Sequence, residues 1–268
     1  TWLTAGDEKL VTTWLEPEAG GQWQQQEQLS CQKKLTAAIF DGDGRIVFAD
    51  RFGDVCRWSG DVGEAELLSS HFAIVTALAL SPCQRFLVVG DNHERVRVSC
   101  YPEAAEIRSF CFGHLMQITA VACEKDGLLS ASADGTLRLW NLDGEEQKCW
   151  TLDAPISCLS YENGTAVLGL EAPQGQVIQL KVETSEVDTL ISEAPQAVKM
   201  QPDGSLLWVD RRGHLHIPDA KGWSEVSPGE DLAPALVILS KNAGDADDAE
   251  EEGDAPKDQK SSKKKRRE

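Results

Sequence analysis

Residues 130–140 read Ser-Ala-Ser-Ala-Asp-Gly-Thr-Leu-Arg-Leu-Trp, and the pair Gly113-His114 precedes them. The Asp-Gly step is a turn signal between two short runs that are rich in strand-forming residues. This spacing predicts that the chain turns between two strands and that a buried hydrogen-bonded chain joins His114, Ser130, Asp134 and Trp140. Such a unit is typical of a WD-type repeat, which forms one four-stranded blade of a β-propeller.

Further copies of this unit are expected, because one blade cannot bury its own apolar faces. Weaker copies of the strand that ends in Trp140 do recur along the chain. Their last residues are at positions 14, 58, 99, 140, 180 and 218, which are separated by 44, 41, 41, 40 and 38 residues. This interval is close to the roughly 40–45-residue period of WD-type repeats. The sequence therefore predicts an all-β WD-repeat β-propeller with six visible repeat units.

Short apolar runs after turn signals mark a second strand within five of the units. They lie at residues 45–50, 86–90, 128–133, 166–170 and 205–210, and we expect them to be buried strands. The first unit lacks an opening strand, and the sequence starts with Thr1 rather than Met, so we expect a leading segment to be missing. The apolar run Ala233–Ser240 predicts one more strand, which would complete an open blade by pairing terminus to terminus.

Composition divides the chain into a propeller over residues 1–241 and a charged tail over residues 242–268. The tail is acidic at Asp245–Asp254 and basic at Lys257–Arg267, with almost no large apolar residues, so we expect it to be disordered. Its basic end suits either nuclear import or contact with RNA, and a solvated tail is the alternative. The candidate residues are Lys263, Lys264, Lys265, Arg266 and Arg267. We expect the protein in the nucleus.

Charge and hydrophobicity exclude several classes of protein. The net charge of −18 argues against a propeller that wraps nucleic acid unaided. No run of 18 apolar residues is present, so no transmembrane helix and no membrane partner is expected, and no secretory signal is visible. None of the eight cysteines forms a Cys-x-x-Cys pair. Buried, reduced thiols of an intracellular protein are the favoured interpretation, with zinc or disulfides as the alternative.

No catalytic constellation is visible in the sequence. His114 belongs to the repeat signature, while His214 and His216 alternate on one expected strand without further ligands, so no metal site is predicted. The sequence contains neither a phosphate-binding glycine loop nor a Ser or Cys nucleophile paired with a base. We therefore expect a protein that is not an enzyme and that needs no cofactor of its own.

The third repeat is the most unusual one. Its turn and strand read Asp91-Asn-His-Glu-Arg-Val-Arg-Val-Ser99, with Ser99 in the place of the Trp and His93 in the place of the turn Asp. The charged residues Glu94, Arg95 and Arg97 lie near the end of a strand. Either they satisfy one another and the backbone of the blade, or they form a charged docking edge. Arginine suits docking because its guanidinium binds a carboxylate through two charge-assisted hydrogen bonds.

The third and fourth repeats together carry a family resemblance. Residues 91–99, the following Ile-Arg-Ser-Phe-Cys-Phe-Gly-His at 107–114 and the repeat to Trp140 are similar to the non-catalytic WD-repeat subunit of the tRNA 7-methylguanosine methyltransferase. That family reads Asp-x-x-Glu-Lys-Ile-Arg-Val-Ser and Ile-x-x-Phe-Cys-Leu-Gly-His. The segment Asp-Arg-Phe-Gly-Asp-Val at 50–55 resembles its Asp-Lys-Ser-Gly-Asp-Val, and the basic terminus also fits. Beyond Trp150 only the repeat frame matches.

The resemblance implies a seven-bladed propeller in a heterodimer with a separate catalytic subunit. That subunit holds S-adenosylmethionine and methylates a guanosine in the variable loop of tRNA, so tRNA is met mainly through the complex. The Lys and Arg of the family motif correspond to Arg95 and Arg97, with Glu94 beside them, and Arg95 departs from the family's Lys. The alternative is a general WD-repeat scaffold, such as a ubiquitin-ligase substrate receptor or a ribosome-assembly factor. The signature at residues 91–114 favours the methyltransferase subunit.

Overall fold

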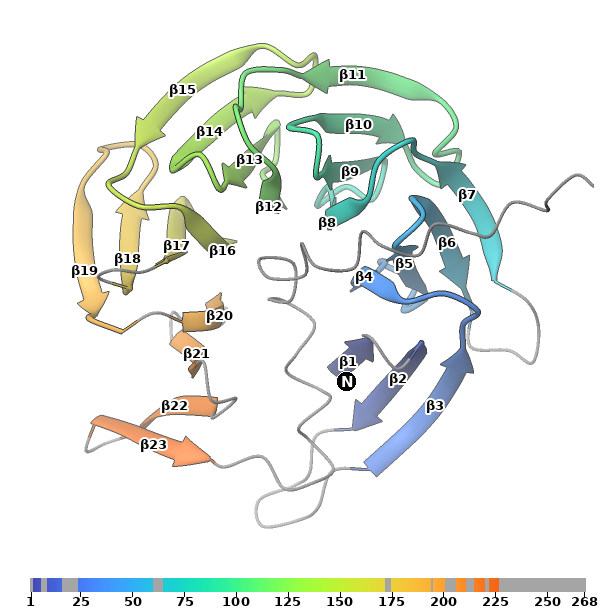
Figure 1. Cartoon of the computed structure of the whole chain (residues 1–268), viewed down its shortest axis with the longest axis horizontal. Coiled ribbons are helices and arrows are strands. Elements are labelled where there is room, and N and C mark those ends of the chain that lie inside the picture. The colour runs from blue at the N-terminus through green and yellow to red at the C-terminus, as the bar shows by residue number, and fades with distance from the viewer. Residues whose placement is uncertain are drawn as a thin grey trace, which may run out of the picture.

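The computed structural model describes residues 2–5, 9–15, 24–59, 65–171, 175–193, 195–200, 206–210, 215–219 and 222–226. The regular structure in these ranges is entirely β-strand, arranged as six antiparallel sheets around a ring (Figure 1). We number the sheets blade 1 to blade 6 in chain order. The prediction of an all-β propeller with six visible repeats is confirmed. The expected strand Ala233–Ser240 and the tail 242–268 lie outside the described residues.

Blade 1 has three strands, and blades 2 and 3 have four each. Blade 1 consists of β1 (Trp2–Ala5), β2 (Leu10–Leu15) and β3 (Gln24–Ser30). Blade 2 consists of β4 (Leu35–Phe40), β5 (Ile46–Asp50), β6 (Asp54–Trp58) and β7 (Glu66–Ser70). Blade 3 consists of β8 (Val75–Leu80), β9 (Phe86–Asp91), β10 (Val96–Cys100) and β11 (Ile107–Cys111).

Blades 4 to 6 repeat the four-stranded arrangement. Blade 4 consists of β12 (Ile118–Cys123), β13 (Gly127–Ser132), β14 (Thr136–Asn141) and β15 (Glu146–Thr151). Blade 5 consists of β16 (Ile156–Glu162), β17 (Thr165–Leu170), β18 (Gln176–Lys181) and β19 (Val187–Ile191). Blade 6 consists of β20 (Pro195–Met200), β21 (Leu206–Asp210), β22 (Leu215–Asp219) and β23 (Gly222–Val226).

The ring is held together by apolar side chains between neighbouring blades. Every residue of β5, β9 and β13 is buried, because a second strand is covered by a blade on each face, which is why these strands read as continuous apolar runs. The cluster between blades 3 and 4 joins Val88, Val96, Val98, Cys111, Ile118, Leu128 and Trp140. The outermost strands, such as β11 and β15, form the perimeter of the ring (Figure 1).

All eight cysteines are free thiols. Cys111 and Cys158 are buried as expected, but Cys83 and Cys149 are exposed, so the expectation of buried thiols is wrong for these two. Hydrogen bonds from Ser81 and Arg85 lower the pKa of Cys83 to about 7. No helix in the described part of the chain is long and apolar enough to cross a membrane.

Candidate partner-binding site

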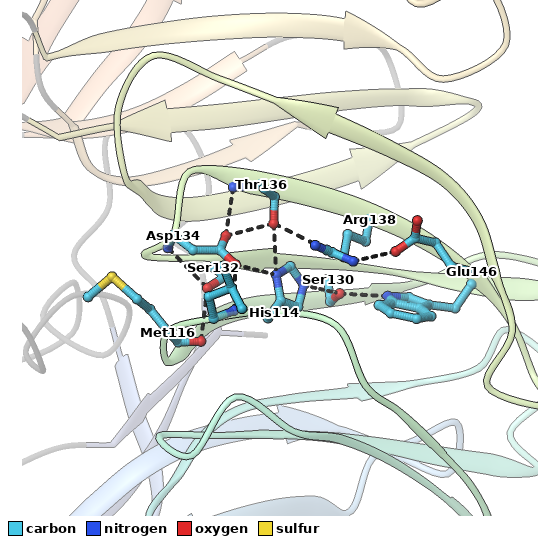
Figure 2. Close-up of polar contacts among 10 residues, drawn as sticks. His114, Met116, Ser130, Ser132, Asp134, Thr136, Arg138 and Glu146 are labelled. Atoms are coloured by element: carbon cyan, nitrogen blue, oxygen red, sulfur yellow. Dashed lines mark hydrogen bonds and ion pairs between the residues drawn. The ribbon is translucent and has the colours of Figure 1, made fainter.

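Blade 4 contains the hydrogen-bonded chain that its sequence predicts among these four residues (Figure 2). The His114 ring bonds Ser130 Oγ through Nε2 at 2.7 Å and Asp134 Oδ2 through Nδ1 at 3.2 Å. Trp140 Nε1 donates to the same Ser130 Oγ at 2.8 Å. His114, Ser130 and Trp140 are 4%, 0% and 2% exposed. The chain thereby ties the loop before β12 to β13 and β14.

The electrostatics of this chain fix its protonation. Burial lowers the pKa of His114, so its ring is neutral. Burial alone would raise the pKa of Asp134, but hydrogen bonds from Thr136 and from the Leu115 and Thr136 amides lower it below the usual range. Because the ionised Asp134 carboxylate only accepts, Nδ1 of the neutral ring carries the proton and donates it to Asp134. Nε2 then accepts from the Ser130 hydroxyl, whose oxygen accepts from the Trp140 indole.

The same network includes two residues that the sequence interpretation missed. Thr136 Oγ1 donates to Asp134 Oδ1 at 2.6 Å and lies 2.9 Å from His114 Nδ1. Arg138 forms an ion pair with Glu146 and lies over the Trp140 ring, 6.0 Å from its centroid. Both residues lie on β14 at alternate positions, on the face that carries Trp140, and that alternation was the available signal.

Blade 3 lacks this hydrogen-bonded chain. Pairing of Val75 with Asp91 corresponds to pairing of Ile118 with Ser132 in blade 4. In this register, the places of the four linked residues are taken by His71, Val89, His93 and Ser99. Valine offers no hydrogen-bonding group and serine has no indole ring, so the chain cannot form. The residues at positions 89, 93 and 99 therefore leave blade 3 without the hydrogen-bonded chain of blade 4.

Arg97 lies at the place that Arg138 occupies in blade 4. Its Nε donates to Ser99 Oγ at 2.8 Å, and its Nη2 donates to the carbonyl oxygen of Ala104 at 2.6 Å. Burial lowers the pKa of Arg97. Whereas Arg138 has Glu146, Arg97 forms no ion pair with any described residue. A half-buried guanidinium without a counter-ion is poorly compensated and favours a carboxylate supplied from outside.

The other two candidate residues lie differently from Arg97. Asp91 Oδ1 accepts hydrogen bonds from the amides of His93 and Arg95 at 2.8 and 3.0 Å. Asp91 Oδ2 pairs with Arg95 Nε at 2.8 Å. Arg95 is therefore satisfied within its own turn, as in the structural alternative, whereas Glu94 is exposed. The three residues share one turn and strand but do not converge on one point.

His71 brings a further titratable group close to Arg97. Burial, followed by the positive charge of Arg97, lowers the pKa of His71 to about 4. Its Nε2 lies 3.3 Å from Ser69 Oγ. His71 is therefore neutral near pH 7, and Arg97 remains without a counter-ion among the described residues.

Other expected site residues fall outside this blade. Lys263–Arg267 and His214 lie outside the described residues, and His216 lies on β22. Within the described ranges, no group of three or more His, Cys, Asp or Glu side chains is placed to hold a metal ion. The described site is thus a surface of charged side chains on blade 3, which suits binding to a protein.

The chain is similar to non-catalytic subunits of one tRNA methyltransferase. Residues 61–178 match the family described as the tRNA methyltransferase TRM82 WD40 domain. The human tRNA (guanine-N(7)-)-methyltransferase non-catalytic subunit WDR4 is 32% identical over 156 residues, which cover 55% of this chain and 36% of that protein. The Xenopus laevis wdr4 subunit is 28% identical over 281 residues, which cover 92% of this chain and 69% of that protein. These matches confirm the resemblance found in the sequence.

The coverage of these relatives is partial. The chain spans 34% of the Dictyostelium discoideum subunit and 36% of the human subunit. Among solved structures, the WD40 β-propeller domain of Doa1 superposes with a TM-score of 0.67 at 15% identity, covering 84% of this chain and 77% of that chain. At that identity the likeness supports the propeller fold alone.

Proposed function

We infer that this chain belongs to the family of tRNA (guanine-N(7)-)-methyltransferase non-catalytic subunits, and we propose that it binds, stabilises and positions a catalytic subunit. The names of the relatives support this role and the expectation that the chain is not itself an enzyme. The observation that carries the proposal is Arg97, a half-buried cation without a counter-ion in the blade that bears the family signature. A general scaffold has no reason to retain that signature.

The mechanism follows from the rigidity of the ring. Blade 3 presents Arg97 to an acidic helix or loop of the catalytic subunit, with Glu94 exposed beside it. Apolar surroundings exclude water from the contact and strengthen the ion pair. Docking stabilises the catalytic subunit because binding favours its bound conformation. In this proposal S-adenosylmethionine and the chemistry belong to the catalytic subunit of a heterodimer, and the substrate is the variable loop of tRNA.

The charged tail has a separate part in the proposal. The basic residues Lys263–Arg267 direct the protein to the nucleus or add a weak, salt-dependent contact to tRNA. A version of the chain that ends at residue 241 separates these roles. Unchanged tRNA affinity of its complex at low salt would exclude the RNA contact, and unchanged nuclear accumulation of a fluorescent fusion would exclude the import role.

The central experiment compares wild-type protein with Arg97→Glu. Each is co-expressed with the catalytic methyltransferase subunit, purified by a tag on this chain and assayed for methylation of unmodified tRNA. Charge reversal at a buried pair is expected to cost roughly 2–5 kcal/mol of binding, so Arg97→Glu should lose the catalytic subunit and its activity. The matched control is Lys181→Glu, which reverses an exposed charge on blade 5 that pairs with Glu186.

Three outcomes decide between the two functions. Capture of the methyltransferase by wild type and Lys181→Glu, but not by Arg97→Glu, supports both the subunit and its contact surface. Equal capture by all three proteins would show that the contact surface does not include Arg97. Failure of wild type to capture the catalytic subunit would contradict the subunit proposal and favour a general scaffold.

A further inference from the structure

The outermost strand of blade 3, β11, exposes large apolar side chains close to Arg97. Ile107, Phe110 and Phe112, which directly follows the strand, are 45%, 38% and 65% exposed. Phe110 pairs directly opposite Arg97, and Ile107 pairs opposite Ser99, so both lie on the face of the blade that carries Arg97. The Phe110 and Phe112 rings stack with their centroids 5.7 Å apart. We call Ile107, Phe110 and Phe112 the apolar stripe.

The opposite face of the same strand is already used inside the protein. Cys111 is fully buried in the cluster between blades 3 and 4. Ser109 Oγ donates to the carbonyl oxygen of Leu142 in blade 4 at 2.8 Å. The exposure of the apolar stripe is therefore not a consequence of a loosely attached strand, because β11 is fixed to blade 4 on its other face.

The apolar stripe has the composition of a protein-binding hot spot. Aromatic residues and arginine dominate such centres, and contiguous exposed apolar side chains mark interaction surfaces. On blade 5, the outermost strand β19 also exposes Val187 and Leu190, at 49% and 42%, but the neighbouring cation Lys181 is already paired with Glu186. In blade 3, by contrast, exposed aromatic rings lie on the same face as a cation that has no counter-ion among the described residues.

We propose that the apolar stripe and Arg97 form one docking surface, and that its occupant is a segment of the catalytic subunit with a carboxylate beside apolar side chains. This inference rests on the proposed function and specifies the chemistry of the partner. The carboxylate neutralises Arg97, and the apolar side chains cover the rings of Phe110 and Phe112. Covering the rings also excludes water from the ion pair, which strengthens it in the lower local dielectric.

Charge argues against one other occupant, and a lack of apolar side chains argues against another. A second copy of this chain carries the same net charge of −18, and like-charged copies repel each other. The chain's own acidic segment Asp245–Asp254 has carboxylates but no large apolar side chain, so it does not complement the apolar stripe. A partner segment that combines both chemistries fits the surface best.

The test measures the affinity of purified catalytic subunit for three versions of this chain. They are wild type, Phe110→Ser/Phe112→Ser in the apolar stripe, and the matched control Val187→Ser/Leu190→Ser on the outermost strand of blade 5. The stripe variant is expected to bind roughly 10-fold to 100-fold more weakly than wild type, on the order of one truncated hot-spot contact. The control variant is expected to bind like wild type. Thermal unfolding of each version checks the fold, and Ile107→Ser serves as a milder second variant.

Salt dependence separates the two halves of the surface. The loss caused by the stripe variant should persist at high salt because it is apolar. The loss caused by Arg97→Gln should shrink only in part, because salt screens a water-excluded ion pair less than an exposed one. Equal affinity of wild type and stripe variant, or an equal loss in the control variant, would overturn the inference while leaving the proposed function intact. Absence of binding by wild type would overturn the proposed function and the inference with it.

Discussion

At the scale of single residues, Ser130 is the centre of blade 4. Its one hydroxyl accepts from the Trp140 indole and bonds the His114 ring, and the residue is fully buried. Because Ser130 is fully buried, both groups depend on this oxygen for their hydrogen bonds. The Ser130 side chain therefore satisfies hydrogen-bonding groups of both Trp140 and His114.

Replacing Ser130 by alanine should destabilise the protein by about 2–6 kcal/mol. The substitution leaves Trp140 Nε1 and His114 Nε2 buried without a partner, and each unsatisfied buried group costs about 1–3 kcal/mol. Urea unfolding followed by tryptophan fluorescence measures the change. Ser192→Ala is the control, because Ser192 is exposed and such substitutions alter stability by less than about 0.5 kcal/mol. A loss no larger than that of Ser192→Ala would refute the assigned role.

At the scale of elements, the turn between β9 and β10 differs from the corresponding turns of blades 2 and 4. Glu94 has a φ of 68°, at the place where those turns have Gly53 with 91° and Gly135 with 79°. A left-handed backbone is unfavourable for a residue with a Cβ atom and costs glycine nothing sterically. In blade 3, therefore, the exposed Glu94 carboxylate comes with a strained backbone conformation in the turn.

Glu94→Gly should accordingly raise the free energy of unfolding by about 0.5–1 kcal/mol, less than the full strain because glycine is also more flexible in the unfolded chain. Chemical denaturation of the isolated protein measures this gain. The reciprocal change, Gly135→Ala, should destabilise, because its Cβ would lie 3.1 Å from the Leu152 carbonyl oxygen at an unfavourable φ. Destabilisation by Glu94→Gly would mean that its side chain stabilises the turn.

Secondary structure was predictable here because each blade repeats one register. The expected second strands at 86–90 and 128–133 agree with β9 and β13 to within a residue at each end, since burial on both faces leaves a continuous apolar run. The Arg97 contacts were not predictable in the same way. They depend on a carbonyl oxygen in the following loop, at Ala104, and on the loss of the Trp that fills this place in blade 4.

At the scale of the whole molecule, the ring depends on how closely adjacent blades approach. Gly90 on β9 faces blade 4, where a Cβ atom at this position would meet Cβ of Ile118 at 3.0 Å and Cγ1 of Val121 at 3.3 Å. The equivalent position in blade 4 is Ala131. Blade 3 therefore lies nearer to its neighbour than a side chain at this position would allow.

Gly90→Ala should cost about 1–3 kcal/mol by overpacking the contact between blades. Combining it with Ile118→Ala makes room for the new methyl group, so the double variant should lose less than the sum of the two single variants. A double-mutant cycle from urea unfolding measures this coupling. Strict additivity would show that the approach of the two blades is not limited at this position.

Trp140 belongs to blade 4, yet its ring lies in the same apolar cluster as Val96 and Val98 of blade 3. The strand that carries Arg97 is therefore supported by a residue that the proposed partner does not touch. In a random screen for lost partner binding, substitutions at Trp140 or Ser130 would be recovered together with those at Arg97. Only a stability measurement on each recovered variant would separate residues that contact the partner from residues that stabilise the strand carrying the contact.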